Sequence, residues 1–146
     1  KKKKKSWWLR GRGLQAVSDF GVASYETWPK YSMNRKLRSD QFVKADAAKN
    51  KLTEFKELPR ESVVDYLVSM ILLGYPVVVC FNWWRHAVLG VDVRFEDKEA
   101  TLDGNYDLLV ANSWGTRWED KGYGWLSKSK AKPDEALVCV DVKVRK

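Results

Sequence analysis

The segment ANSWGTRWEDKGYGW, residues 111–125, sets three tryptophans, one tyrosine and three glycines around a single asparagine, Asn112. A carboxamide surrounded by aromatic side chains loses its contacts with water, so its hydrogen bonds must be made within the protein. The segment therefore predicts that Asn112 is held in place for a polar partner from elsewhere in the chain.

His86 is the candidate partner, because it is the only histidine in the sequence and opens a second strand-like run. An amide oxygen that accepts the ring N–H would fix the tautomer and orientation of the imidazole, and would leave the other nitrogen free to exchange a proton with a nucleophile. Trp114 and Trp118 are placed to cover this bond against water. A single histidine is more often structural than catalytic, so both interpretations stay open.

Composition and length favour a globular protein, since the chain has 146 residues, 45% of them hydrophobic, and eight tryptophans. No apolar run approaches the ~18 residues of a membrane span, so we expect no membrane partner. The formal charge is +8, but five of the positive charges come from Lys1, Lys2, Lys3, Lys4 and Lys5. This block is either a tail for nucleic acid or another anionic surface, or an artificial extension.

The two cysteines, Cys80 and Cys139, both lie in strand-like apolar runs. Two small core side chains are the simpler interpretation, and a disulfide between neighbouring strands remains open. Two cysteines and one distant histidine do not have the spacing of a metal site, and the chain lacks a phosphate-binding glycine loop. We therefore expect no metal and no cofactor.

Hydrophobic periodicity predicts a helix over residues 13–20, an extended segment over 22–29, and a second, clearer helix within 58–76 that Pro59 begins and Gly74 ends. Residues 32–58 are polar, with weak periodicity, and predict a connection that holds one strand or helical turn. Five strands are predicted at 76–84, 86–97, 106–115, 122–128 and 136–144. This order predicts an α+β fold with a mostly antiparallel sheet or small barrel.

Several of these segments resemble the papain-like cysteine peptidases. HAVLGVDV from His86 is similar to the family's His-Ala-Val segment, and ANSWGTRWEDKGYGWL from Ala111 to its Asn-Ser-Trp-Gly segment. LLGYPVVVCF resembles the helix-to-strand approach to the histidine, and LQAVSDFGVASYETWP the helix and Trp-Pro segment that follow the catalytic cysteine. The motifs stand in the family's order, whereas residues 30–58 match nothing specific.

The resemblance implies an α+β, papain-like fold, represented mostly by the antiparallel β-barrel subdomain with part of the helical subdomain at the N-terminus. It divides the chain into a basic tail or artificial extension at 1–5, a remnant of the helical subdomain at 6–31, a polar connection at 32–58, and a helix plus β-barrel subdomain at 59–146.

The same resemblance implies that His86 is the general base and acid and that Asn112 is its orienting partner. It makes Trp114 the shield over their hydrogen bond, with Trp118 as a supporting side chain. Two residues depart from the family pattern. Arg85 stands where a small or acidic residue often precedes the histidine, and Glu119 replaces the glycine that follows the second tryptophan.

The family's nucleophile lies in a Gln…Cys-Gly-x-Cys-Trp stretch, which this chain does not contain. Neither Cys80 nor Cys139 is predicted at the positive end of a helix, where a low thiol pKa arises, so the nucleophile remains unidentified. The expected function is therefore a thiol peptidase, present as its His/Asn-bearing portion, with a protein or peptide substrate and a Cys-bearing segment or chain as partners.

Two other functions remain open. The chain is alternatively a catalytically inactive papain-like module that acts as a structural or binding component of a larger assembly. A weaker possibility is nucleic-acid binding, through the lysine block and the tryptophans and arginines that follow it. The sequence gives no indication of location, because the lysine block lacks the apolar region of a signal peptide.

Overall fold

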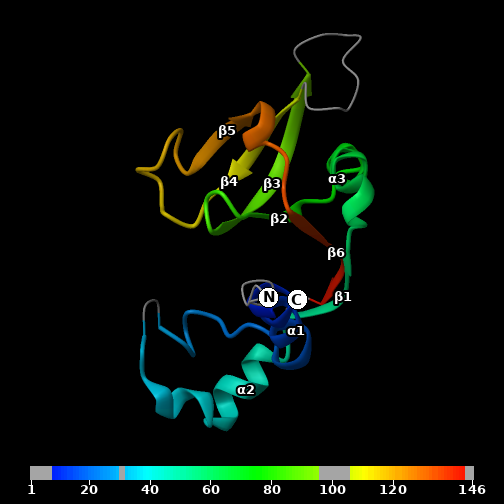
Figure 1. The fold of residues 1–146 in the computed structure, drawn as a ribbon. Coiled ribbons are helices and arrows are strands. Elements are labelled where there is room, and N and C mark those ends of the chain that lie inside the picture. Colours follow the sequence, from blue (N-terminus) through cyan, green and yellow to red (C-terminus); the bar gives the residue numbers. More distant parts are fainter. Residues whose placement is uncertain (1–7, 30–31, 96–105, 144–146) are drawn as a thin grey trace, which may run out of the picture. The chain divides into compact units, whose positions relative to one another are not determined.

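The computed structural model describes residues 8–29, 32–95 and 106–143, whose helices and strands are labelled in Figure 1. The chain forms two compact units. Unit 1 comprises Lys1–Phe55 and Val140–Lys146, and unit 2 comprises Lys56–Cys139. The lysine block and residues 96–105 lie outside the described residues.

Unit 1 contains two α-helices, α1 (Trp8–Phe20) and α2 (Gln41–Ala47), and the short 3-10 helix η1 (Arg35–Arg38). The expected start of α1 at residue 13 was wrong, because the helix begins at Trp8 and includes Gly11, although a glycine costs a helix about 1 kcal/mol relative to alanine. Asp40 caps the N-terminus of α2, because its carboxylate accepts hydrogen bonds from the backbone N–H groups of Phe42 and Val43.

Asp46 of α2 explains a second departure from the sequence prediction. Its buried carboxylate accepts the backbone N–H of Ser24 at 2.8 Å and the hydroxyl of Thr27 at 2.7 Å. The segment 22–29, expected to be extended, therefore folds into a turn, in which the N–H of Trp28 donates to the carbonyl of Ser24 at 2.8 Å.

Gly21 directly follows α1, and its backbone lies against the last residue of α2, Ala47. It has φ +80°, and a Cβ at this position would collide with the carbonyl group of Ala47. The next residue, Val22, donates its N–H to the carbonyl of Asn50 at 2.9 Å. Only glycine permits both this conformation and this close approach of two backbone segments.

Unit 2 contains the helix α3 (Val63–Leu72) and most of the sheet. Its strands and short helices are η2 (Arg60–Ser62), β2 (Val77–Phe81), β3 (His86–Phe95), β4 (Tyr106–Ala111), β5 (Tyr123–Ser127) and η3 (Lys128–Lys130). Strands β1 (Lys51–Glu57) and β6 (Glu135–Lys143) each run across the boundary between the two units. The strand order is β1-β6-β2-β3-β4-β5, and the pairs from β6 to β5 are antiparallel.

The predicted α+β class is confirmed, and each of the five predicted strands is present with bounds shifted by a few residues. Strand β1 is the sixth, and it lies in the stretch 32–58, as do η1 and α2. In the described ranges, no helix is both long enough and apolar enough to cross a membrane.

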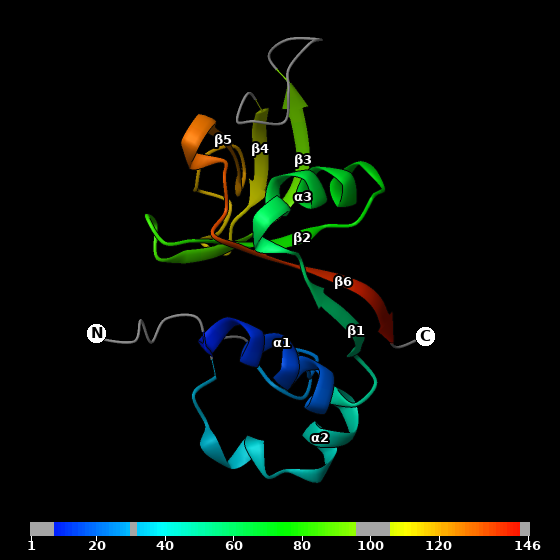
Figure 2. The ribbon, with the colours of Figure 1, turned by 45° about the vertical axis from the view of Figure 1, so that its right-hand side comes forward.

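The core of unit 2 forms where α3 lies against β2 and β3 (Figure 2). Leu67, Val68 and Ile71 of α3 are buried, at the helical spacing that the sequence predicted. They pack with buried side chains of the sheet, which include Val77, Val79, Val88, Leu108 and Val110. This packing holds β3, which begins at His86, and β4, which ends directly before Asn112.

A comparison of Gly21 with Gly74 tests the close approach of Gly21 to Ala47. Gly74 has a similar φ of +86° but open space around it. Gly74→Ala should lower the free energy of unfolding by about 1 kcal/mol through backbone strain alone. Gly21→Ala should cost a further ~1–3 kcal/mol, because the added methyl group meets the backbone of α2. Urea titrations followed by circular dichroism measure both, and equal losses would show that the close approach at Gly21 contributes nothing.

Candidate active site

Antiparallel pairing places the beginning of β3 and the end of β4 at the same end of the sheet, with Leu89 opposite Ala111. His86 is the first residue of β3, and Asn112 directly follows β4. The His86 Nε2 and the Asn112 Oδ1 are 2.9 Å apart. The contact expected between the lone imidazole and the carboxamide is therefore confirmed.

The direction of this hydrogen bond determines which imidazole nitrogen can take a proton. A carboxamide oxygen only accepts, so the Nε2 of the neutral ring must carry the hydrogen and donate it. The Nδ1 of His86 is then the nitrogen with a lone pair, the form that a general base requires.

The loop after β4 holds Asn112 through its backbone. The N–H of Asn112 donates to the carbonyl of Gly122 at 2.9 Å, and the N–H of Gly122 donates to the carbonyl of Trp118 at 2.8 Å. Gly122 has φ +97°, a conformation that favours glycine. The loop thus closes on itself and fixes the position from which the Asn112 side chain extends.

Two tryptophans contact the imidazole, and a third packs against them. The ring of Trp114 stacks on His86, with centroids 4.9 Å apart and an interplanar angle of 25°. Trp84 meets both rings edge-on, at 5.1 Å from His86 and 5.6 Å from Trp114, and Trp118 lies 6.3 Å from Trp114. The sequence pointed to Trp114 and Trp118, whereas it placed Trp84 at the end of the strand predicted over 76–84. In the structure that strand ends at Phe81, and Trp84 lies in the turn before His86.

Gly124 was also missed, and it positions Trp118. A Cβ at residue 124 would lie 2.6 Å from the Cη2 of Trp118, so the bare backbone of β5 leaves the space that the indole occupies. The signal was present in the sequence, since a glycine inside a strand often marks a close approach.

The amide nitrogen of Asn112 differs from the amide oxygen, which is hydrogen-bonded to His86. The Nδ2 atom is buried and has no hydrogen-bond partner in the part of the chain that the structure describes. A buried donor without a partner costs about 1–3 kcal/mol. The unpaired Nδ2 therefore opposes folding, whereas the hydrogen bond of Oδ1 to His86 stabilises the side chain.

The two departures from the family pattern both occupy left-handed backbone. Arg85 has φ 52° at the end of the turn before His86, and Glu119 has φ 42° directly after Trp118. Glycine adopts this conformation without strain, whereas other residues do so at a cost of ~1–2 kcal/mol. At both positions the backbone adopts a conformation that favours glycine, although the side chains are those of arginine and glutamate.

The structure gives no support to either cysteine as a nucleophile, and both are thiols rather than halves of a disulfide. Cys80 is buried in β2, where Phe81 pairs with His86, so the alternation of side chains places Cys80 on the other face of the sheet. Burial raises the pKa of the Cys139 thiol, which disfavours the reactive thiolate.

Comparison with known proteins gives partial matches, and no family model matches the chain. Cathepsin Q from Rattus norvegicus is 43% identical over 51 residues, which are 35% of this chain and 14% of that protein. Testin-2 from Rattus norvegicus is 52% identical over 44 residues, 30% of this chain and 13% of that protein.

Solved structures match over more of the chain. The digestive procathepsin L2 proteinase from the Tenebrio molitor larval midgut has a TM-score of 0.62 at 21% identity, over 86% of this chain and 45% of that one. The bromelain protease from Ananas comosus, in complex with the E64 inhibitor, has a TM-score of 0.59 at 16% identity, over 92% of this chain and 68% of that one.

These structural neighbours are papain-like cysteine peptidases, so the resemblance inferred from the motifs is confirmed and the chain has the papain-like fold. The chain spans less than half the length of the procathepsin L2 structure, and its sequence match to Cathepsin Q covers about a seventh of that protein.

The hydrogen bond between His86 and Asn112 predicts the tautomer of the imidazole. In the wild-type protein the neutral ring should carry its proton on Nε2, and Asn112→Ala should produce a mixture of both tautomers. Long-range ¹H–¹⁵N correlation spectra measure this without ambiguity, because the sequence has one histidine. Ser113→Ala is the control and should leave the tautomer unchanged, and a mixture already present in the wild type would contradict the contact.

The left-handed backbone at Glu119 predicts a stabilising substitution. Glu119→Gly should raise the free energy of unfolding by about 1 kcal/mol, because glycine removes the strain at φ 42°. Glu119→Ala removes the same carboxylate but keeps a Cβ, so it should bring no such gain. Thermal unfolding of the wild type and the two variants distinguishes the two causes. Relief of backbone strain would stabilise Glu119→Gly alone, whereas removal of the charge would stabilise both variants alike.

Proposed function

We propose that this papain-like chain is the portion of a thiol peptidase that supplies the catalytic base and the group that orients it. The observation that carries the proposal is the 2.9 Å contact between the His86 Nε2 and the Asn112 Oδ1. It leaves Nδ1 as the basic nitrogen, next to a ring face that Trp114 covers. The structural neighbours, which are cysteine peptidases, support the reaction class.

In the proposed reaction, the Nδ1 of His86 takes the proton of a cysteine thiol, and the thiolate attacks the carbonyl carbon of the scissile peptide bond. The imidazolium then gives that proton to the leaving amine nitrogen as the C–N bond breaks, which leaves a thioester. A water molecule attacks the thioester while Nδ1 takes its proton, and the returning proton releases the thiol and a carboxylic acid.

Asn112 and the tryptophans act on the imidazole throughout this cycle. The Oδ1 of Asn112 accepts the Nε2–H in both the neutral and the charged ring, so the ring keeps its orientation when it gains a proton. The indole of Trp114 keeps water from competing for that hydrogen bond, which strengthens it.

The proposal requires the nucleophile and the oxyanion-binding glutamine to come from a segment that this chain does not include. Cys80 and Cys139 are unsuited by position and by pKa respectively. A Cys-bearing segment or chain is therefore the proposed partner, and a protein or peptide is the proposed substrate.

A second candidate is the inactive papain-like module, in which unit 1 would supply a surface for contact with another protein. Several large apolar side chains are strongly exposed there: Phe20 at 72%, Tyr25 at 74%, Met33 at 89% and Phe42 at 83%. Exposed apolar groups of this size are typical of surfaces that contact another protein. Nucleic-acid binding by Lys1 to Lys5 stays a prediction, because these residues lie outside the described ranges.

Reconstitution tests the peptidase proposal. The chain is co-expressed with the Cys-bearing segment encoded in its own transcript, and cleavage of a fluorogenic peptide library is measured. Cleavage should stop on alkylation with iodoacetamide and fall by ~10²–10⁴-fold in His86→Ala, the usual contribution of general acid–base catalysis. Asn112→Ala should retain partial activity, and Ser113→Ala, which leaves the imidazole untouched, should be fully active.

Two results would contradict the proposal. One is a transcript that encodes serine or glycine in place of the cysteine, which supports the inactive module instead. The other is cleavage that His86→Ala leaves unchanged, because the activity would then come from another site.

A further inference from the structure

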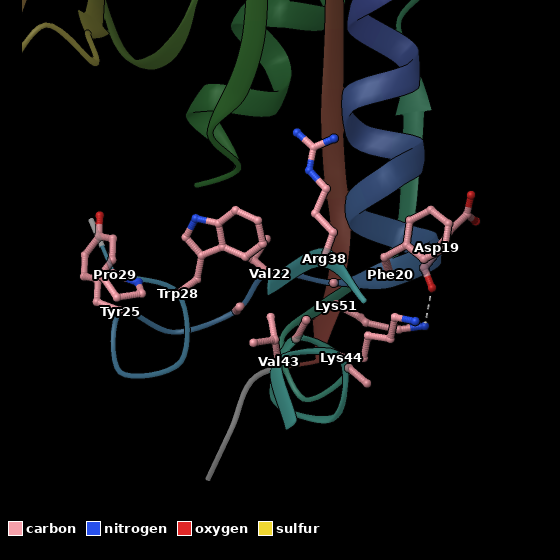
Figure 3. A pocket seen from close by; sticks show the side chains of 14 residues that line it. Asp19, Phe20, Val22, Tyr25, Trp28, Pro29, Arg38, Val43, Lys44 and Lys51 are labelled. Atoms are coloured by element: carbon pink, nitrogen blue, oxygen red, sulfur yellow. Dashed lines mark hydrogen bonds between the residues drawn. The ribbon is translucent and has the colours of Figure 1, made fainter. Parts of the chain in front are cut away.

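Unit 1 contains a cavity of about 870 Å³ that the His86 site does not use. It lies between the end of α1, the turn after Gly21, η1 and α2 (Figure 3). Its apolar lining includes Phe20, Val22, Trp28 and Val43. The volume falls within the ~300–1,000 Å³ of typical small-molecule sites, whose walls are also mostly apolar.

Hydrogen bonds within the protein hold the walls of this cavity. The Trp28 indole Nε1 donates to the carbonyl of Ser32 at 3.2 Å, which orients the largest lining side chain. The Lys51 ammonium donates to the backbone carbonyl of Asp19 at 2.7 Å, the dashed line in Figure 3. These two bonds restrict Trp28 and Lys51, so the two side chains lose less conformational entropy when a ligand enters.

The charged groups of the lining are mostly positive. Arg38, Lys44 and Lys51 line the cavity together with a single carboxylate, that of Asp19. The Asp19 carboxylate accepts a hydrogen bond from the Gln15 amide at 2.8 Å. Among the described residues, no ion pair joins Arg38 or Lys44 to an acid, so both cations remain available to an anion.

We propose that this cavity binds a small amphipathic carboxylate, with an apolar body of ring or alkyl type and one acidic group. The apolar walls would gain about 25 cal/mol for each Å² of apolar ligand surface that they remove from water. The planar guanidinium of Arg38 matches a carboxylate in two parallel hydrogen bonds, and Lys44 adds a second positive charge. An apolar amine meets the same walls but is repelled by the cations.

Three ligands with one carbon skeleton test the chemistry: 4-phenylbutyrate, 4-phenylbutanol and 4-phenylbutylamine. Titration into the full chain, followed by ¹H–¹⁵N correlation spectra, should move resonances of the cavity lining. The carboxylate should bind at least about tenfold more tightly than the alcohol, and the amine more weakly than both. Equal binding of acid and alcohol would overturn the proposal, because it indicates adsorption to apolar surface only.

Matched substitutions locate the anion contact. Arg38→Met should reduce the preference for acid over alcohol to less than about twofold. Arg35→Met, in the same 3-10 helix but outside the lining, should leave the preference intact. Lys44→Met and Lys49→Met form a second such pair, since only Lys44 lines the cavity. If the two members of each pair behave alike, the carboxylate does not bind where we propose.

These experiments are independent of the peptidase proposal. The cavity belongs wholly to unit 1, whereas His86 and Asn112 belong to unit 2, so either proposal can fail without the other. The variant Trp28→Ala distinguishes the loss of apolar contact in the cavity from the loss of a positive charge. It should weaken the acid and the alcohol by the same factor, because it removes apolar contact and no charge, and a selective loss of acid binding would contradict the assigned roles.

Discussion

The antiparallel register of β3 and β4 is the constraint on which the site depends. Slipping one strand by a single residue would turn its side chains to the opposite face and separate His86 from Asn112. Gly90 helps to fix that register. A Cβ there would lie 3.2 Å from the Cδ1 of Leu108 and 3.4 Å from the Cδ1 of Ile71, so β3 packs tightly on both β4 and α3. The hydrogen bond at the site is thus a consequence of core packing in the middle of the sheet.

The residues around this hydrogen bond are less favourable for stability than the core that positions it. Arg85, Glu119 and Lys121 adopt left-handed backbone in the two loops that flank the pair, and the Nδ2 of Asn112 is buried with no partner among the described residues. Strain of this kind persists where the surrounding structure over-determines the conformation, and it gathers at functional sites. Three of these strained positions lie in the loops that carry His86 and Asn112, and a fourth, Lys128, lies directly after β5.

The sequence predicted this pair because its signals were local and strong: a single histidine at one strand start and an asparagine within an aromatic segment. It missed residues 8–12 of α1, where Gly11 weakens the helical signal. It also left α2 and β1 within a polar connection, where periodicity is weak. The Asp40 cap and the pairing of β1 with β6 stabilise those elements. The cavity was beyond prediction, because its walls come from four separate segments.

The imidazole is oriented without any contribution from a nucleophile. Among the described residues, the groups that hold it, from Trp84 to Gly122, all lie within unit 2. A cysteine that approached Nδ1 would meet a ring already in the correct tautomer, and a chain that had lost its cysteine partner would keep the same ring. The active and inactive interpretations therefore share one structure at His86. What separates them is whether a cysteine thiol is presented to Nδ1.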